Sequence, residues 1–381
     1  MDPSNNNDEL LSLLEYFSDA LGNYNFTKND ILNKFARYDF DELSPPRAKQ
    51  RDGVILYASP FVFLFGVAGH LMSLLILPYF AKKESTYVYL LFLSIFDLLV
   101  LHVGLLIRWL QEILAVDILS LNNYTCKVLT FLGLVFSDTS VWLLVVVTLE
   151  RFVLLYHPFR AKLICTVRRS LIIILFMFVA MAVLNGHVFW TLEIITDNVT
   201  QSQNCDSAAN SNALIYQIWP LMDSLIYFIL PFLCTCVFNY KIIRKIRHIK
   251  IRNRICNSRR FPRVRREQKR PKVERKLTIT MVILSLAFIM TTLPMLIYLC
   301  VTAVMNSLHK QPIFSRERYQ YFRSFAELMM YTNHAVNFYL YIANSRRLRL
   351  WFQKRICQQK AEQLVIGNEV LEKQEYSSRF S

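Results

Sequence analysis

Seven blocks of apolar residues, each long enough to cross a lipid bilayer, constrain this chain more than any other feature. The hydrocarbon core of a bilayer is about 30 Å thick, so a helix needs about 20 apolar residues to cross it. Each block carries at most one acidic residue and no Lys or Arg, whereas the outer helices of a soluble protein carry polar stripes at helical spacing. The sequence therefore predicts an all-α membrane protein, a seven-transmembrane helix bundle. The blocks are 54–81, 85–107, 128–149, 170–192, 213–240, 277–309 and 324–345.

The basic residues between the blocks predict the orientation of the chain. Lys and Arg gather on the cytoplasmic side of membrane proteins. They follow the first block (Lys82 and Lys83) and the third, and the segment 241–276 holds 17 of them against two acids. The opposite side includes 191–212, which has none. We therefore expect an extracellular N-terminus and a cytoplasmic C-terminus.

The formal net charge of +16 is explained by the same placement. Because the excess lies beside the cytoplasmic helix ends, we expect no nucleic-acid partner. Basic residues at these ends are suited instead to anionic membrane lipid.

The chain divides into four parts on this interpretation. We expect a flexible extracellular tail (1–52), a seven-transmembrane domain (53–345), a short amphipathic helix (346–357) and a flexible cytoplasmic tail (358–381). The first part has no basic region followed by an apolar one, so the first membrane helix should direct insertion. Asn25 and Asn198 open glycosylation sequons on the outer side, whereas the sequon at Asn123 lies too near the membrane.

Short motifs fall in a fixed order along the blocks. Cys126 opens the third block, Glu150-Arg151-Phe152 follows 24 residues later, and Pro158 stands seven residues after Arg151. The other motifs are Leu93-Ser94-Ile95-Phe96-Asp97 in the second block, Pro231 in the fifth, Phe288 and Pro294 in the sixth, and Asn337-Phe338-Tyr339-Leu340-Tyr341 in the seventh.

Together these motifs resemble those of rhodopsin-like (class A) G-protein-coupled receptors over about 290 residues. Three further phrases are similar to invertebrate neuropeptide receptors of the FMRFamide and myosuppressin type; they are Leu184-Asn185-Gly186-His187, Thr291-Thr292-Leu293-Pro294 and Asn333-His334-Ala335-Val336-Asn337-Phe338. The family's tryptophan before Pro294 is absent here, and His70 stands where the family has Asn. These departures concern the activation path and leave the architecture unaffected.

Asp97 is the clearest functional candidate inside the membrane, where acidic residues are costly. The resemblance implies a sodium site formed by Asp97, Ser140, Asn333 and Asn337, with Na⁺ as an allosteric ion and no cofactor required. Oxygen ligands suit such a hard cation. We also hypothesise that protonated His70 pairs with Asp97 and competes with Na⁺.

Three acids, Glu112, Asp223 and Glu327, are expected near the outer ends of their helices and could surround a cavity open to the outside. Its aromatic walls would come from Trp219, Tyr298, Phe325 and Tyr331. Such a pocket suits a peptide that carries arginine and aromatic rings. The alternative is that some of these acids only hold helices together, which is the role we favour for Asp138.

Two absences weigh against other ligands of the family. Amine receptors carry Asp seven residues after the cysteine of the third helix, where this chain has Gly133. Opsins hold retinal through a Lys in the seventh helix, and that block has none; Tyr331 occupies about that level.

The resemblance also implies an inner switch, a disulfide and a lipid anchor. Arg151 should be the switch, with Glu150 beside it and Glu274 as its clamp; the alternative is that Glu274 is a solvated loop acid. Phe159 should contact the G protein, and Tyr341 should hold the active state.

The family's disulfide would join Cys126 to Cys205. Cys357 is either palmitoylated or a free thiol, and serines of the tail could recruit arrestin once phosphorylated.

We therefore expect a multi-pass plasma-membrane receptor for an amidated extracellular neuropeptide that signals through a heterotrimeric G protein. The alternatives are a receptor for a non-peptide ligand, such as a lipid or odorant, and a transporter or channel. An enzyme is not expected, because the sequence has no Gly-rich phosphate loop, metal cluster or nucleophile with a nearby base.

Overall fold

The computed structural model describes residues 52–196, 203–208, 211, 215, 218–258, 269–307, 316–344, 348–351 and 353. The predicted modification sites at Asn25, Asn198 and Cys357 lie outside this part of the chain. The backbone of Glu274 lies in a described helix, but its side chain is outside the description.

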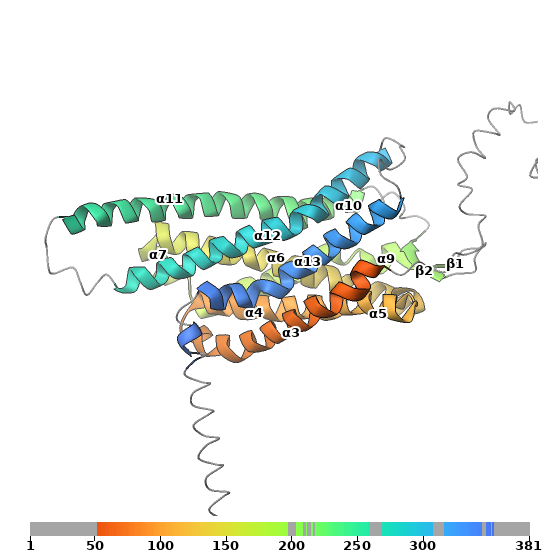
Figure 1. The fold of residues 1–381 in the computed structure, drawn as a ribbon, viewed down its shortest axis with the longest axis horizontal. Helices are drawn as coiled ribbons and strands as arrows, with labels where there is room; N and C mark the ends of the chain where they lie inside the picture. The colour runs from red at the N-terminus through yellow and green to blue at the C-terminus, as the bar shows by residue number, and fades with distance from the viewer. Residues whose placement is uncertain are drawn as a thin grey trace, which may run out of the picture. The chain divides into compact units, whose positions relative to one another are not determined.

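The predicted seven-helix bundle is the observed architecture (Figure 1). Four of the spans are single helices, the fourth span is one helix followed by a short one, and the second and fifth spans each contain a π-helical turn, η1 and η4. The spans are α3 (Gly53–Ala81); α4 (Ser85–Val100), η1 (Leu101–Leu106) and α5 (Ile107–Leu114); α6 (Asn123–Tyr156); α8 (Val167–Asn185) and α9 (Val188–Thr191); α10 (Trp219–Asp223), η4 (Ser224–Ile229) and α11 (Leu230–Ser258); α12 (Lys269–Ser307); and α13 (Arg316–Asn344).

Six of these spans are long and apolar enough to cross a membrane by length and composition. The seventh, α13, is as long as α3 but carries more polar residues, among them Asn333, His334 and Asn337. These three side chains are buried. The polarity of α13 therefore faces the inside of the bundle.

Local sequence explains where several helices begin. Asp52 caps α3 by accepting hydrogen bonds from the backbone amides of Val54 and Ile55. Asn122 and Thr125 form a reciprocal capping box at the start of α6. A short helix, α7 (Pro158–Ile164), starts at the proline that follows α6, because proline is preorganised for a first helical turn.

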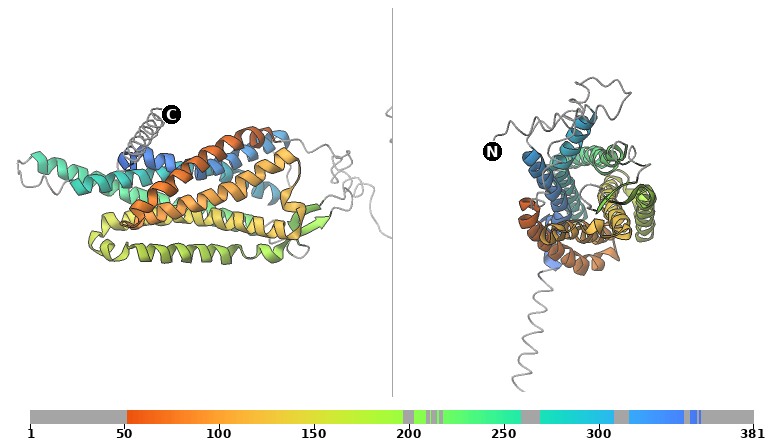
Figure 2. Two further views of the ribbon diagram at one scale, coloured as in Figure 1. Left: turned by 90° about the horizontal axis from the view of Figure 1, so that it is seen from below. Right: turned by 90° about the vertical axis from the view of Figure 1, so that its right-hand side faces the viewer.

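The helices pack in the order of a closed bundle. α3 lies between α4 and α13, α13 also packs on α12, and α6 contacts α4, α8 and α11 (Figure 2). Gly66 of α3 permits one close approach, since a Cβ atom there would lie 2.5 Å from Leu101 Cδ1 and 2.9 Å from Ala335 Cβ. A larger residue at this position would push α3 away from η1 and α13.

Several helices extend beyond the apolar blocks at the cytoplasmic end. α11 continues to Ser258, although its apolar block ends at residue 240, and α12 begins at Lys269 rather than at residue 277 (Figure 1). The basic residues of these extensions are good helix formers. Hydropathy therefore underestimates the helix length here.

A β-hairpin on the outer side adds to the predicted helices. β1 (Leu192–Thr196) pairs antiparallel with β2 (Gln203–Ser207), with Ile194 opposite Cys205. This two-stranded sheet lies in the loop between the fourth and fifth spans, at the extracellular end of the bundle (Figure 2).

Candidate functional site

Three hydrogen-bond donors converge on the fully buried carboxylate of Asp97. Ser140 Oγ donates to Oδ1 at 2.5 Å, and Asn337 Nδ2 donates to Oδ2 at 2.6 Å. The third donor is His334, whose Nδ1 lies 2.8 Å from Oδ1. His334 Nε2 in turn lies 3.1 Å from the hydroxyl of Tyr227, so one buried network joins α4, α6, α13 and η4.

This arrangement differs from the predicted sodium site in one residue, and that residue changes its chemistry. The prediction placed Asn333 beside Asp97, whereas the structure places the neighbouring His334 there. An imidazole N–H and an amide N–H now donate to the carboxylate oxygens of Asp97, while Asn337 and Ser140 still carry oxygen atoms that suit a hard cation. The binding of Na⁺ at this site stays a prediction.

The predicted pairing of His70 with Asp97 is wrong. His70 Nε2 lies 2.7 Å from the backbone carbonyl of His334 and donates to it. His70 therefore holds the backbone of α13, and His334 fills the role that we expected of His70.

Asp138 and Asp223 lie in different surroundings. Asp138 Oδ2 accepts a hydrogen bond of 2.7 Å from Asn185 Nδ2, and both residues are buried. This contact joins α6 to α8, which agrees with the structural role expected for Asp138. Asp223 is half-buried at the end of α10.

At the outer end of the bundle, three acids surround one arginine. Arg108 of α5 forms an ion pair with Glu112, lies 3.6 Å from Glu327 of α13, and lies 3.9 Å from Asp52 at the start of α3. The backbone amide of Asp52 also donates to Glu112 at 3.0 Å, and Ser324 donates to the Asp52 carboxylate. We call Asp52, Arg108, Glu112 and Glu327 the outer charge cluster; it joins three helices.

The outer charge cluster includes a basic residue that the sequence analysis did not place beside these acids. Arg108 stands one residue beyond the second apolar block and was missed. Its spacing from Glu112 places the two on neighbouring turns of one helix, which is a signal that the sequence contains. The contacts to Asp52 and Glu327 depend on tertiary packing and have no such signal.

The predicted aromatic walls are divided among several contacts. The rings of Trp219 and His187 lie 3.7 Å apart between centroids, and Tyr298 packs on Tyr319 at 5.1 Å. Tyr331 is buried against Gly104 of η1, where a Cβ atom would lie 2.7 Å from its ring. Phe325 is half-exposed, at 49%. The structure therefore does not bring these rings together as one wall.

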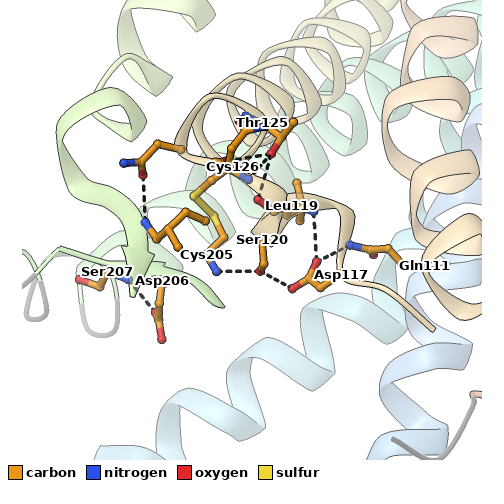
Figure 3. The surroundings of a disulfide bond; sticks show 12 residues. Gln111, Asp117, Leu119, Ser120, Thr125, Cys126, Cys205, Asp206 and Ser207 are labelled. Atoms are coloured by element: carbon orange, nitrogen blue, oxygen red, sulfur yellow. Dashed lines mark hydrogen bonds between the residues drawn. A yellow bond between two sulfur atoms is a disulfide. The ribbon is translucent and has the colours of Figure 1, made fainter. Parts of the chain in front are cut away.

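A disulfide joins Cys126 to Cys205, as the resemblance implied, with Cα atoms 5.5 Å apart. The bridge attaches β2 to the start of α6 (Figure 3). Cys205 N donates to Ser120 Oγ at 2.9 Å, and Ser120 donates to Asp117 at 2.7 Å. The hairpin is also held by Asn123, whose Oδ1 accepts from the backbone amide of Ile194, so this sequon residue has a structural role.

At the inner end, Glu150 is held by the second span. Ser85 and Thr86, at the start of α4, both donate to its carboxylate, and the Thr86 bond is 2.6 Å long. Arg151 is 4% exposed, and its Nε and Nη2 atoms have no hydrogen-bond partner among the described residues. The predicted clamp between Arg151 and Glu274 lies outside the described side chains.

Two other predicted inner residues lie in opposite environments. Tyr341 is buried, and its hydroxyl has no partner in the described part of the chain. Phe159 of α7 is 84% exposed on the cytoplasmic side, where a large apolar ring is available to a partner. Beyond α13, Leu348 is buried and Trp351 packs 6.4 Å from the ring of Phe80, so this segment lies against the inner end of α3.

The sequence of this chain is similar to those of several known receptors. The chain is 25% identical to the growth hormone secretagogue receptor type 1 of Sus scrofa over 195 residues, which are 49% of this chain and 51% of that receptor. It is 36% identical to the human neuromedin-U receptor 2 over 111 residues (29% and 26%) and 24% identical to the human histamine H2 receptor over 279 residues (72% and 71%). The match to the first of these relatives thus spans about half of that receptor's length.

The family model of the seven-transmembrane receptors of the rhodopsin family matches residues 71–341 of the 381. The match runs from the inner part of the first span, α3, to Tyr341 at the inner end of the seventh, so it includes the five spans between them and most of the seventh. The chain therefore belongs to the rhodopsin family of seven-transmembrane receptors.

Proposed function

We propose that this chain is a receptor for an extracellular peptide with a cationic, aromatic end, and that it signals through a heterotrimeric G protein. As a member of its family, it is a multi-pass protein of the plasma membrane and a receptor rather than an enzyme. The observation that carries the proposal is the gathering of acid in the outer charge cluster, where Asp52, Glu112 and Glu327 share the ion-pair partner Arg108, and Arg323 is a second cation that acts on Glu327. Asp223 adds a further acid in the outer half of the fifth span.

A guanidinium group of the peptide would compete with Arg108 for one of these acids. Glu327 is more available than Glu112, which also holds the backbone of Asp52, and than Asp52, whose carboxylate caps α3 and accepts from Ser324. Its own contact with Arg108 is 3.6 Å long. A guanidinium can engage a carboxylate bidentately, which favours arginine over lysine in the ligand.

The relatives' names include both peptide and amine ligands, so the amine class must be weighed. Amine receptors bind the amine through an Asp that stands seven residues after the cysteine of the third span, and this chain has Gly133 at that position. Gly133 faces open space, since no atom lies within 4 Å of where its Cβ would be. A receptor that has no acid at the level of Gly133 and has its acids nearer the outer surface suits a peptide better than an amine. The phrases similar to FMRFamide and myosuppressin receptors favour an amidated peptide.

The inner end supports coupling to a G protein. Arg151 and Tyr341 are buried at the inner end of the bundle, where the family resemblance places the switch. Movement of α12 away from α6 would open a groove for the G protein, as a population shift between two packings. Phe159 would contact the G protein surface. Arrestin is the further partner that we propose for the phosphorylated tail.

The experiment is a screen of amidated peptides on cells that express the receptor, with calcium and cAMP readouts. A peptide with an Arg-aromatic end should activate it, and Glu327→Gln should lower the potency of that peptide at least tenfold. The matched variant Glu327→Asp keeps the charge and should restore most of the potency.

Three results would contradict the proposal. Equal potency at Glu327→Gln and the wild type would exclude the acid as a ligand contact. Activation by lipids or odorants and by no peptide would favour the non-peptide class. Ion flux in cells without G proteins would favour a channel or transporter.

A further inference from the structure

A pocket of about 480 Å³ opens between the cytoplasmic ends of α6 and α11, at the end of the molecule opposite the outer charge cluster. Its walls combine aromatic rings from α6 with basic side chains from α11, and none of the lining residues is acidic. They are Phe152, Tyr156, Tyr240, Lys241, Arg244, Lys245 and His248.

The rings of α6 position two of the basic side chains. Lys241 Nζ lies 5.7 Å from the centroid of Phe152, and Lys245 Nζ lies 5.1 Å from that of Tyr156. A cation over an aromatic face is held there without losing its charge. The hydroxyl of Tyr156 also donates to the backbone carbonyl of Lys241 at 2.9 Å, which fixes α6 to α11 beside the pocket. The rings of α6 therefore hold the two ammonium groups beside an open pocket.

The outer face of α11 leads from the membrane into this pocket. Leu233, Val237 and Tyr240 are 51%, 49% and 66% exposed, and they follow one another at helical spacing. Arg244 and His248 continue the same face towards the cytoplasm and line the pocket. An apolar stripe that ends in a basic pocket matches the two parts of a lipid, with acyl chains along the stripe and the headgroup in the pocket.

We propose that this pocket binds an anionic lipid of the cytoplasmic leaflet that carries a multiply phosphorylated headgroup. Lys241, Arg244 and Lys245 supply three fixed positive charges, more than the single net charge of phosphatidylserine requires. Phosphate monoesters carry up to two charges each and accept several hydrogen bonds. The volume admits a ring-sized headgroup, and the position matches the leaflet in which anionic lipids concentrate.

The experiment uses the full-length receptor in nanodiscs, with lipid binding measured by native mass spectrometry after exchange. Three membranes are compared: phosphatidylcholine alone, phosphatidylcholine with phosphatidylinositol bisphosphate, and phosphatidylcholine with phosphatidylserine at equal total charge. The test variant is Lys241→Gln with Lys245→Gln. The control is Lys82→Gln with Arg247→Gln, which removes the same charge from two exposed cytoplasmic residues outside the pocket.

The wild type should prefer the bisphosphate lipid, and the test variant should bind it about 30-fold more weakly, as expected for the loss of two basic contacts near the membrane. The control should change affinity less than threefold. Water-soluble inositol trisphosphate should compete poorly, because it lacks the acyl chains that follow Leu233 and Val237.

Equal losses in the test and control variants would overturn the proposal and indicate general surface charge. Full competition by the soluble headgroup would overturn it in favour of a free phosphate compound. A defect in G-protein binding of the test variant in phosphatidylcholine alone, without any lipid preference in the wild type, would assign the pocket to the G protein. Thermal unfolding of both variants in detergent checks that each is folded.

Discussion

Replacing His334 with alanine should destabilise the receptor by disrupting the buried network around Asp97. His334 is 0% exposed and lies 2.8 Å from Asp97 Oδ1, 3.1 Å from the Tyr227 hydroxyl and 3.4 Å from Ser140 Oγ. Alanine removes all three contacts at once. No nearby side chain can replace the imidazole without moving α13, whose backbone is held there by His70.

The size of the loss follows from these contacts. A hydrogen bond to a charged group contributes about 1.5–3 kcal/mol, and leaving the Tyr227 hydroxyl unpaired costs about 1–3 kcal/mol more. Asp97 keeps Ser140 and Asn337 as donors, so the carboxylate is not orphaned. Together the two contributions span about 2.5–6 kcal/mol, and we expect the lower half of this range. With the small cavity that the ring leaves behind, the loss in the free energy of unfolding should be about 3–5 kcal/mol.

Thermal unfolding of the purified receptor in detergent, followed by a thiol-reactive dye, measures this loss. For a chain of this size the midpoint should fall on the order of 10 °C. The matched control is His102→Ala, because His102 is an exposed histidine of η1 whose Nδ1 contacts only the Leu98 carbonyl among the described hydrogen-bond partners. The control should lower the midpoint by about 2 °C or less.

The reasoning would be refuted by a midpoint of His334→Ala that lies within 2 °C of the control. That result would mean that water or a neighbouring side chain replaces the imidazole at little free-energy cost. The variant His334→Asn separates the contribution of the Asp97 hydrogen bond from that of the Tyr227 hydrogen bond. Its shorter amide keeps a donor near Asp97 and loses the contact with Tyr227.

Three further predictions concern the ions and the two ends of the bundle. Exchange of sodium for choline should leave peptide affinity and the unfolding midpoint unchanged, because three hydrogen bonds already stabilise the Asp97 carboxylate; a sodium-dependent shift in either would show that Na⁺ binds there. Arg108→Gln should lower stability by about 1–3 kcal/mol, since the acids around it lose their shared cation and the site is a quarter exposed; combining it with Glu327→Gln should recover part of the loss in the same assay, and additive losses would argue against the ion pair. Glu150→Gln should raise basal cAMP or calcium signalling several-fold, because a neutral amide holds Ser85 and Thr86 less strongly; unchanged basal activity would mean that this contact does not restrain α6.

The sequence predicts the spans well because burial in lipid demands long uncharged blocks, and it predicts the disulfide through the family resemblance. It does not predict which face of each helix meets which neighbour. Asn333 and His334 differ by one position, about 100° around α13. Spacing along the chain does not set the rotation of a helix about its axis, so the residue that contacts Asp97 emerges only from the packed bundle.

The β-hairpin and the outer charge cluster were missed for a similar reason. β1 and β2 are short and are fixed by the disulfide and by Ser120 and Asn123 rather than by a strand-like pattern of their own. Asp52 and Glu327 are far from Arg108 in the sequence, and their contacts need α3, α5 and α13 in place. Interactions within one helix can be predicted from spacing, whereas those that join helices need the tertiary structure.

α13 joins the proposed ligand site to the buried network, and this gives the bundle a physical route between its ends. Glu327, His334 and Asn337 stand seven and three residues apart on this helix, so they share one face, and Glu327 lies about 10 Å above His334 at 1.5 Å per residue. A ligand that draws Glu327 away from Arg108 must move a helix that is fixed to Asp97 at two points. The two hydrogen bonds to Asp97 resist such a movement, so we expect ligand binding and the buried network to be coupled through α13. Weakening the network with His334→Ala should therefore change the affinity for the peptide as well as the stability, although His334 lies too deep to touch the peptide.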